Sequence, residues 1–345
     1  STSDVFQRVR GRGVRTGVLI AGDSRHELTE KCVLPDRGRP GQVLSMRHRT
    51  AFVTGATGYI GRSAVAAFLE RGWGVTALSR RTDHELPPSV RPWIADFTEV
   101  ERWAPLARRA DVIVNLAFPA HGDGWASAVA LERDVLDALA DHLRDYPGRL
   151  ILTNGTAFLG DSGDGRLGPE ARVDKAHPAA IRAATTSPSR WSDLDVVELR
   201  FASFVYGRNG SVFLPALLDH ARSTGESIQV DAGSAVASTV DVDAAGRACV
   251  AAAEQEGPCR ATHHIAGDEE PTTGQIARAV AIATGSQVVS VSVEEAARRL
   301  DPFTAMFLAQ NNRLDIRTAR AELGWSGATS TPLLWDVAFG SYAPP

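Results

Sequence analysis

A glycine-rich turn between a predicted strand and a predicted helix limits the folds open to this chain more than any other feature. The turn reads TGATGYIG over residues 54–61 and directly follows the apolar run at 51–54. Apolar residues then recur at helical spacing from Arg62 to Arg71, and Gly72 ends the pattern. A strand, a tight glycine turn and a helix in this order are typical of the first unit of a parallel α/β sheet.

The three glycines of the turn have separate physical roles. Gly55 allows the sharp bend, Gly58 lets the backbone approach a phosphate without an intervening Cβ, and Gly61 lets the helix pack close to the sheet. Free N–H groups at the helix start then bind the anion. We therefore predict that the turn binds the pyrophosphate of a dinucleotide; a glycine turn without a ligand is the alternative. The predicted contacts are Gly55, Thr57, Gly58, Tyr59, Ile60 and Gly61.

Strand and helix patterns alternate along the residues that follow. The segment at 111–118 is almost continuously apolar, as expected of a strand that is covered on both faces. Alternating elements joined by short loops predict an α/β fold with a Rossmann-type, doubly wound parallel sheet. Further strands are predicted at 74–78, 93–95, 149–153 and 196–204, and helices at 99–109 and 125–143.

The chain divides into three predicted parts. Residues 1–45 hold eight cationic and five anionic side chains and are interrupted by glycines, so we expect an extension outside the core fold, or an arm that binds a partner or nucleic acid. A dinucleotide-binding Rossmann domain is predicted over 46–207 and 237–267. A smaller C-terminal substrate-binding lobe is predicted over 208–236 and 268–345. Its helices are predicted at 212–222, 273–284 and 293–300.

Composition excludes several classes of protein. The chain is 43% hydrophobic with a net charge of −4, which argues against extensive disorder. Its pI near 6.2 argues against a general nucleic-acid binder. No apolar stretch reaches the ~18 residues of a membrane helix. The three cysteines have neither metal-site nor disulfide spacing. We expect a cytoplasmic protein that acts on a small molecule, without a metal, a nucleic acid or a membrane as partner.

The end of the second predicted strand indicates which dinucleotide is bound. An NAD site usually has an acidic residue there, which accepts a hydrogen bond from the ribose 2′-hydroxyl. This chain instead has Ser79, Arg80 and Arg81. Guanidinium groups present forked donors that suit a 2′-phosphate. We therefore predict that NADP (as NADPH) is preferred over NAD, the alternative being that the arginines belong to a solvated loop.

Further motifs give the chain a family resemblance. They are Asp96-Phe97, NLA at 115–117, VYG at 205–207, the strand-like TVDVD at 239–243 and AELGW at 321–325. Together with the glycine turn, these motifs resemble the short-chain dehydrogenase/reductase superfamily, in its extended branch of NAD-dependent epimerases and dehydratases. The resemblance covers about residues 50–340 and implies a possible homodimer through the helix at 125–143.

The resemblance also implies roles for residues at the ends of the other strands. Asp96 and Phe97 would hold the adenine. Leu116, Ala117 and Phe118 would line the ribose and nicotinamide. The remaining implied cofactor contacts are Thr153, Ser203, Phe204 and Val205, the last three beside the nicotinamide amide.

The catalytic residues of this family are missing in part. The family uses a Ser or Thr after the fifth strand and a Tyr-x-x-x-Lys motif further on, where the tyrosine moves a proton to or from the carbonyl oxygen. Neither Lys31 nor Lys175 follows a tyrosine at that spacing, and residues 161–195 contain no tyrosine. Gly155 stands where the family has its Ser or Thr. We therefore predict an atypical catalytic site with a non-standard proton donor.

Four residues are candidates for the missing functions. Asn154 and Thr156 could donate hydrogen bonds to a developing oxyanion. His177 could act as acid or base, because imidazole titrates near neutral pH, although it could equally begin the helix before Pro178. Arg182 could replace the lysine as a fixed positive charge. Weaker candidates are Lys175, Asp174 and His121, while His263 and His264 form a poor metal site because adjacent strand residues face opposite ways.

Three functions remain open from the sequence. The first is an NADP-dependent oxidoreductase that reduces a carbonyl on a small molecule of the nucleotide-sugar or secondary-metabolite type. The second is a non-redox isomerase, dehydratase or cyclase on the same fold. The third is a catalytically silent NADP-binding regulatory protein. Phe303, Met306 and Phe307 either line the substrate pocket or belong to the core.

Overall fold

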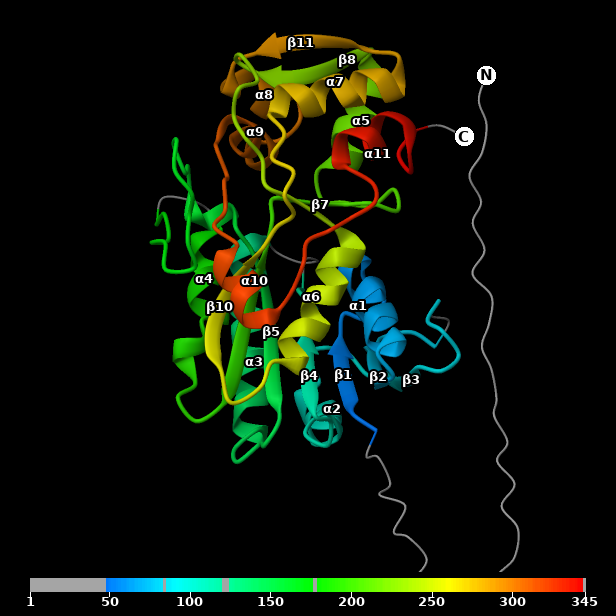
Figure 1. Ribbon diagram of the computed structural model, residues 1–345, viewed down its shortest axis with the longest axis vertical. Coiled ribbons are helices and arrows are strands. Elements are labelled where there is room, and N and C mark those ends of the chain that lie inside the picture. The colour runs from blue at the N-terminus through cyan, green and yellow to red at the C-terminus, as the bar shows by residue number, and fades with distance from the viewer. Residues whose placement is uncertain (1–47, 83–84, 120–123, 176–178, 344–345) are drawn as a thin grey trace, which may run out of the picture. The chain divides into compact units, whose positions relative to one another are not determined.

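The computed structural model describes residues 48–82, 85–119, 124–175 and 179–343 (Figure 1). Contacts within the chain separate Ser1–Met46 from Arg47–Pro345. All the described residues belong to the second of these segments. The predicted N-terminal extension, 1–45, lies outside the described residues.

A seven-stranded sheet has the order β10-β6-β5-β4-β1-β2-β3, and every neighbouring pair is parallel. The carboxyl ends of its strands therefore lie along one edge. This arrangement confirms the predicted Rossmann-type, doubly wound α/β fold. The strands are β1 (Thr50–Thr54), β2 (Gly74–Ser79), β3 (Arg91–Ile94), β4 (Val112–Asn115), β5 (Arg149–Gly155), β6 (Asp195–Phe201) and β10 (Arg260–Ile265).

Helices cover both faces of the sheet because successive strand residues are apolar on both sides. In β1, Val53 packs into a core cluster with α1 (Tyr59–Glu70) and α6 (Val242–Glu254). Its neighbour Phe52 packs on the other side with α2 (Val100–Ala107) and α3 (Trp125–His142). The helices α1 and α6 lie side by side (Figure 1), so close that a Cβ on Gly246 would come within 2.5 Å of the Ser63 backbone.

A second apolar cluster joins elements from the later part of the chain. They are α5 (Leu214–Thr224), β8 (Glu226–Val230), α7 (Thr273–Thr284), β11 (Gln287–Val291), α8 (Val293–Arg299), α9 (Pro302–Ala309) and α11 (Leu333–Phe339). Strands β8 and β11 pair in parallel. Leu323 of α10 (Arg317–Leu323) and Trp325 pack instead into the first cluster, with α1 and α6. The division into domain and lobe stays a prediction.

The structure corrects two predicted strands. The strand predicted at 196–204 ends at Phe201, and the chain then forms β7 (Phe204–Tyr206), which pairs with β9 (Thr239–Asp241) in a separate sheet. The prediction of one strand-like segment at 239–243 is wrong. The Asp241 carboxylate accepts hydrogen bonds from the N–H groups of Asp243 (3.0 Å) and Ala244 (3.1 Å), which caps α6 and ends the strand.

Short helical segments complete the described structure. They are α4 (Ala180–Thr186) and two 3₁₀ turns at Ala157–Leu159 and Pro188–Arg190. Within the described ranges, none of the helices combines the length and the apolar character needed to cross a membrane.

Candidate functional site

A cavity of about 560 Å³ lies at the carboxyl edge of the sheet. This edge is where open α/β sheets bind ligands. The cavity is lined by residues that follow β1, β4, β5 and β6, and by side chains of α9 and the segment before α5. The lining includes Gly58, Leu116, Thr153, Thr156, Ser203, Phe213 and Phe303.

The glycine turn borders the cavity, and its geometry explains each glycine. Gly55 has a φ of +66°, and a Cβ there would lie 2.6 Å from the Ala117 nitrogen. A Cβ on Gly61 would lie 2.0 Å from the Gly55 oxygen, so no larger residue fits. Gly58 has an ordinary φ of −73° and lines the cavity. The fold therefore requires glycine at Gly55 and Gly61. Gly58 has no side chain and so leaves the cavity open beside the turn.

The start of α1 has unsatisfied backbone donors beside this turn. Gly58 is the N-cap, no side chain caps the helix, and its first turn has no acidic residue. The N–H groups of Tyr59, Ile60 and Gly61 have no acceptor among the described residues. Such donors, together with the helix dipole, suit an anion. The turn fits the pyrophosphate of a dinucleotide.

Tyr59 has a structural role in addition to lining the cavity. Its hydroxyl donates to the Gly207 carbonyl (2.8 Å), and its ring packs so closely on Gly210 that a Cβ there would lie 2.2 Å from Tyr59 Cε2. Burial, together with the nearby Tyr342, raises the pKa of the Tyr59 phenol above its usual range. This phenol therefore does not supply the missing acid–base tyrosine at neutral pH. The neighbouring Thr57 is exposed, and its carbonyl accepts from Arg62 Nε (3.0 Å).

The end of β2 presents two exposed arginines. Ser79 Oγ donates to the Arg81 carbonyl (2.9 Å) and accepts from its N–H (3.2 Å), which closes the turn after the strand. Arg80 and Arg81 are exposed beyond that turn. Near them, Asp96 Oδ1 accepts from the N–H (2.9 Å) and hydroxyl (2.7 Å) of Thr98, and these bonds lower the pKa of Asp96.

Some of the other predicted cofactor residues line the cavity, and some do not. Leu116, Phe118, Thr153 and Val205 line the cavity. Ala117 donates its N–H to Thr54 Oγ1 (3.3 Å).

Two predicted aromatic contacts face the core instead of the cavity. The Phe97 ring stacks against Trp103 with ring centroids 6.3 Å apart. Phe204 is fully buried in the second apolar cluster, against Phe213 and Phe307, and is absent from the cavity lining. A cofactor contact through the Phe204 side chain therefore has no support from its position.

Thr156 and Ser203 meet at a buried amide that the sequence did not single out. Asn312 Oδ1 accepts from the hydroxyls of Thr156 (3.0 Å), Ser203 (2.6 Å) and Ser238 (2.7 Å). A carbonyl oxygen has two lone pairs, so the three hydroxyls cannot all donate well at once. Thr156 and Ser203 also line the cavity, and either hydroxyl can turn its proton toward a ligand oxygen.

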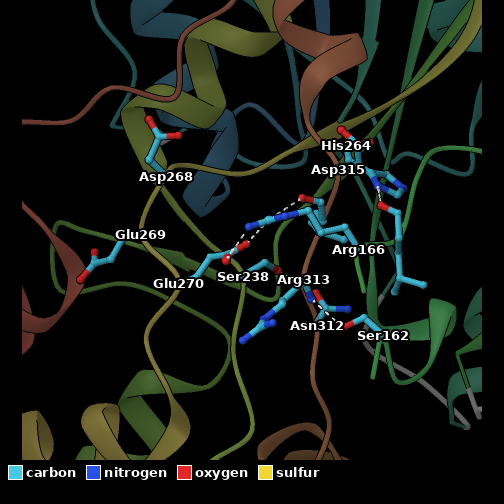
Figure 2. Close-up of polar contacts among 12 residues, drawn as sticks. Ser162, Arg166, Ser238, His264, Asp268, Glu269, Glu270, Asn312, Arg313 and Asp315 are labelled. Carbon is cyan, nitrogen blue, oxygen red and sulfur yellow. Dashed lines mark hydrogen bonds and ion pairs between the residues drawn. The ribbon is translucent and has the colours of Figure 1, made fainter. Parts of the chain in front are cut away.

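The segment that carries Asn312 is fixed by charged neighbours (Figure 2). Arg166 forms an ion pair with Glu270 and also donates to the Leu314 carbonyl (3.2 Å). Ser162 Oγ accepts from the Arg313 N–H (3.2 Å). The position of Asn312 therefore depends on contacts between distant parts of the chain, and no local motif marks it.

Asn154 and Arg182 meet in a second buried network. The Arg182 guanidinium binds the Glu132 carboxylate through Nε (2.8 Å) and Nη2 (2.7 Å), and Nη1 donates to Asn154 Oδ1 (3.2 Å). Asn154 Nδ2 donates to Thr186 Oγ1 (2.8 Å). The guanidinium also lies 4.4 Å from the centre of the Phe118 ring, and Arg182 lines the cavity. The structure thus places a fixed cation beside Asn154, one of the two predicted oxyanion donors, whose amide already donates to Thr186.

Glu132 is a site residue that sequence reasoning missed. It is fully buried on α3, on the same face as Val129 and Val135. A carboxylate among apolar residues at helical spacing needs a buried partner. That pattern is readable in the sequence, but the identity of the partner is not.

The histidines divide into two groups. His177 and His121 lie outside the described residues, so their predicted roles stay predictions. His264 Nδ1 lies 3.0 Å from the Leu167 carbonyl, whereas His263 Nε2 lies 3.8 Å from Glu322. Their partners lie in different segments, as expected of side chains on opposite faces of a strand. Among the described residues, no three His, Cys, Asp or Glu side chains could hold a metal together.

Buried His264 predicts a loss of stability in acid. Burial, and then the charge of Arg200, lower the pKa of His264 from 6.5 to about 4. As the pH falls, His264 takes up a proton at a higher pH in the unfolded chain than in the folded protein. The free energy of unfolding therefore falls as the pH drops from above 6.5 toward 4. Between neutral pH and pH ~5 we expect His264 to account for a loss of about 2 kcal/mol.

Urea unfolding of the wild type and of His264→Asn at the two pH values measures this effect. The variant should lose less stability than the wild type by that amount. His48→Asn removes an exposed histidine and should behave as the wild type. An equal loss in the wild type and in His264→Asn would show that His264 does not control the acid response.

Comparisons with known proteins agree with this fold. The model of the NAD dependent epimerase/dehydratase family matches residues 51–266. An uncharacterized protein of Schizosaccharomyces pombe is 27% identical over 296 residues, covering 84% of this chain and 99% of its own length. An uncharacterized protein of Saccharomyces cerevisiae is 22% identical over 287 residues, which covers 79% of this chain and 93% of that protein's length.

Solved structures share the fold at low sequence identity. UDP-glucose 4-epimerase from Thermotoga maritima, solved with UDP-glucose, has a TM-score of 0.67 and 19% identity, covering 85% of this chain and 97% of its own. A dTDP-glucose 4,6-dehydratase from Bacillus anthracis, solved with NAD, has a TM-score of 0.65 and 15% identity. The match covers 85% of this chain and 94% of that protein. The family model spans more than half of the sequence and includes the glycine turn and the strands around the cavity. This chain therefore belongs to the NAD dependent epimerase/dehydratase family.

Proposed function

We propose that this protein is an NADP-dependent oxidoreductase that reduces a carbonyl group on a small molecule. One observation carries the proposal. The glycine turn at Gly58 and hydrogen-bond donors at the end of β5 border the same cavity. A cofactor on the turn and a carbonyl near those donors would share that space. Family membership and the NAD-bound relatives support binding of a nicotinamide dinucleotide.

The chain's own residues would polarise the carbonyl and deliver a proton. When bound, the nicotinamide dinucleotide supplies the hydride. The guanidinium of Arg182 stays positive and is held in place by Glu132, so it would stabilise negative charge on the carbonyl oxygen without reorganising. The hydroxyls of Thr156 and Ser203 line the cavity and would pass a proton from solvent to the carbonyl oxygen, each taking up one proton as it gives one. Asn312 would orient both hydroxyls as a positioning residue.

Oxidation of NADPH in the presence of small carbonyl compounds tests the proposal. Ketones, aldehydes and nucleotide-linked keto sugars form the panel, and the ultraviolet absorbance of the reduced nicotinamide is the readout. The absorbance should fall with at least one substrate and produce the matching alcohol. Tight NADPH binding without turnover of any member would reject the proposal.

A second candidate function has support from the family match. Epimerases and dehydratases give the family its name. In such a reaction the dinucleotide would return to its starting state, so product would form without net change in nicotinamide absorbance. Analysis of the products by mass spectrometry and NMR separates the two candidates. A cytoplasmic location and a homodimer stay predictions.

We further propose that Arg80 and Arg81 select NADP. Each charge-assisted hydrogen bond to the 2′-phosphate contributes about 1.5–3 kcal/mol, so removing one arginine should weaken NADPH binding roughly tenfold or more. NADH affinity should stay nearly constant, because NADH lacks that phosphate. Titration calorimetry of Arg80→Ala and Arg81→Ala with both dinucleotides measures the difference.

Arg91→Ala is the matched control for NADP selection. Arg91 is also exposed but begins β3, at the opposite edge of the sheet from the ends of the strands. Its affinity for NADPH should equal that of the wild type. A wild type that binds NADH more tightly than NADPH would contradict the assignment.

A further inference from the structure

Aromatic rings form a large part of the described cavity walls. Eight aromatic side chains contribute to the described lining, and some neighbouring rings pack against each other. Phe118 and Trp125 have centroids 5.0 Å apart, and Phe213 and Phe307 have centroids 4.6 Å apart. The other four are Tyr59, Phe158, Phe201 and Phe303. Aromatic walls stabilise apolar ligands by burying carbon surface.

The described lining offers no spare positive charge. Arg182 is the only charged side chain in it. Four of its five N–H groups are already bonded, to the Glu132 carboxylate, to Asn154 and to the Thr153 carbonyl (3.0 Å), so it has one hydrogen bond left for a carbonyl oxygen but no unpaired charge for a diphosphate. A second diphosphate, in addition to that of the dinucleotide at the start of α1, would lose its water against these walls without gaining a free cation, which is strongly unfavourable.

Apart from Tyr59 and Arg182, the polar side chains of the described lining lie at the ends of two neighbouring strands. Thr153, Asn154 and Thr156 come from the end of β5, and Ser203 follows β6. A ligand that matches this distribution has one oxygen-bearing end and an apolar remainder. A sugar, with hydroxyl groups around its whole ring, would leave most of them without partners.

Two apolar side chains of the lining are unusually exposed. Val212 has a relative exposure of 77% and Trp125 of 41%. An apolar ligand would remove both from water, whereas a hydrated sugar nucleotide would not. Exposed apolar groups around a concave surface commonly mark a ligand site.

We propose that the cavity accepts an uncharged, mainly apolar carbonyl compound with an aromatic or branched aliphatic body, and that it rejects nucleotide-linked sugars. The carbonyl part of this assignment rests on the proposed function. The apolar part rests on the lining alone. In this respect the chain differs from structural relatives solved with UDP-glucose.

Trp125 provides a direct test that does not require turnover. The full-length protein, saturated with NADP⁺ to prevent reduction, is titrated with acetophenone, cyclohexyl methyl ketone and UDP-glucose while tryptophan fluorescence is recorded. The two ketones should change the fluorescence with saturation, and UDP-glucose should not. Trp125→Phe should remove the ketone response, which assigns the signal to the cavity.

A matched pair of variants locates the binding surface. Val212→Asp places a charge at the cavity and should weaken ketone binding at least tenfold, about 1.4 kcal/mol. Val288→Asp makes the same change on β11, at a side chain that is also exposed (37%) and outside the lining, and should leave ketone binding unchanged. Equal ketone affinities for both variants would overturn the proposal.

The experiments distinguish a wrong proposal about the substrate class from a wrong proposal about the reaction type. Saturable binding of UDP-glucose without binding of either ketone would overturn the apolar assignment, whatever the reaction. Ketone binding at Trp125 without oxidation of NADPH by any carbonyl compound would support the assignment and reject the proposed reduction. Turnover of nucleotide-linked keto sugars alone would overturn the assignment and support the reduction.

Discussion

Replacing Gly58 with alanine should weaken binding of the nicotinamide dinucleotide about 100-fold and leave the fold intact. Gly58 has a φ of −73°, which alanine adopts without strain, and the nearest atom to an added Cβ is the Gly55 oxygen at 3.1 Å. The methyl group would, however, stand where the backbone must approach the phosphates. A loss of about 2–3 kcal/mol corresponds to this change in Kd. Titration calorimetry with NADPH, alongside thermal unfolding, measures both quantities.

Two other glycines serve as comparisons. A Cβ on Gly74 would lie 3.5 Å from Thr50 Cγ2 and 3.9 Å from the Arg49 oxygen, which are ordinary contacts, so Gly74→Ala should retain full affinity and stability. Gly61→Ala would place a Cβ 2.0 Å from the Gly55 oxygen and should lower the stability itself. Unchanged NADPH affinity in Gly58→Ala would show that the cofactor does not use this turn, and the proposed function would lose its main support.

Replacing Arg182 with methionine should destabilise the protein by about 3–5 kcal/mol, because it leaves a buried carboxylate without its partner. Glu132 has no exposed surface, and both of its oxygens bind Arg182, at 2.7 and 2.8 Å. The double variant Arg182→Met, Glu132→Gln removes both charges and should recover most of that loss. Urea unfolding of the single and double variants measures the difference.

The double variant also separates catalysis from stability. If Arg182 polarises the substrate carbonyl, kcat should fall about 100-fold even where the stability is restored. Arg133→Met is the control, since Arg133 pairs with Asp134 on the same helix as Glu132, both side chains are more than half exposed, and the change should alter the stability by less than about 1 kcal/mol. A stable double variant with wild-type kcat would remove Arg182 from the mechanism.

The sheet and the turn were predictable because their signals are local. Residues 51–61 contain a buried strand, the bend at Gly55 and the start of α1, and each follows from residues only a few positions apart. The predicted helix began at Arg62, whereas α1 begins at Tyr59, because the turn runs directly into the helix. Asp241 shows the limit of such patterns. The alternating pattern at 239–243 predicts one strand, but the Asp241 carboxylate caps α6, and the strand ends there.

The sequence alone determined the parallel sheet and the glycine turn, since apolar periodicity and glycine conformation act over a few neighbouring residues. Only the tertiary structure decided which polar side chains form hydrogen bonds with each other and which residues bury them. Thr156 reaches Asn312 across 156 positions, and Arg182 reaches Glu132 across 50. The aromatic cavity likewise draws Phe118 and Phe307 from distant segments. Such contacts arise from packing between elements, and no local pattern in the chain encodes which partners will meet.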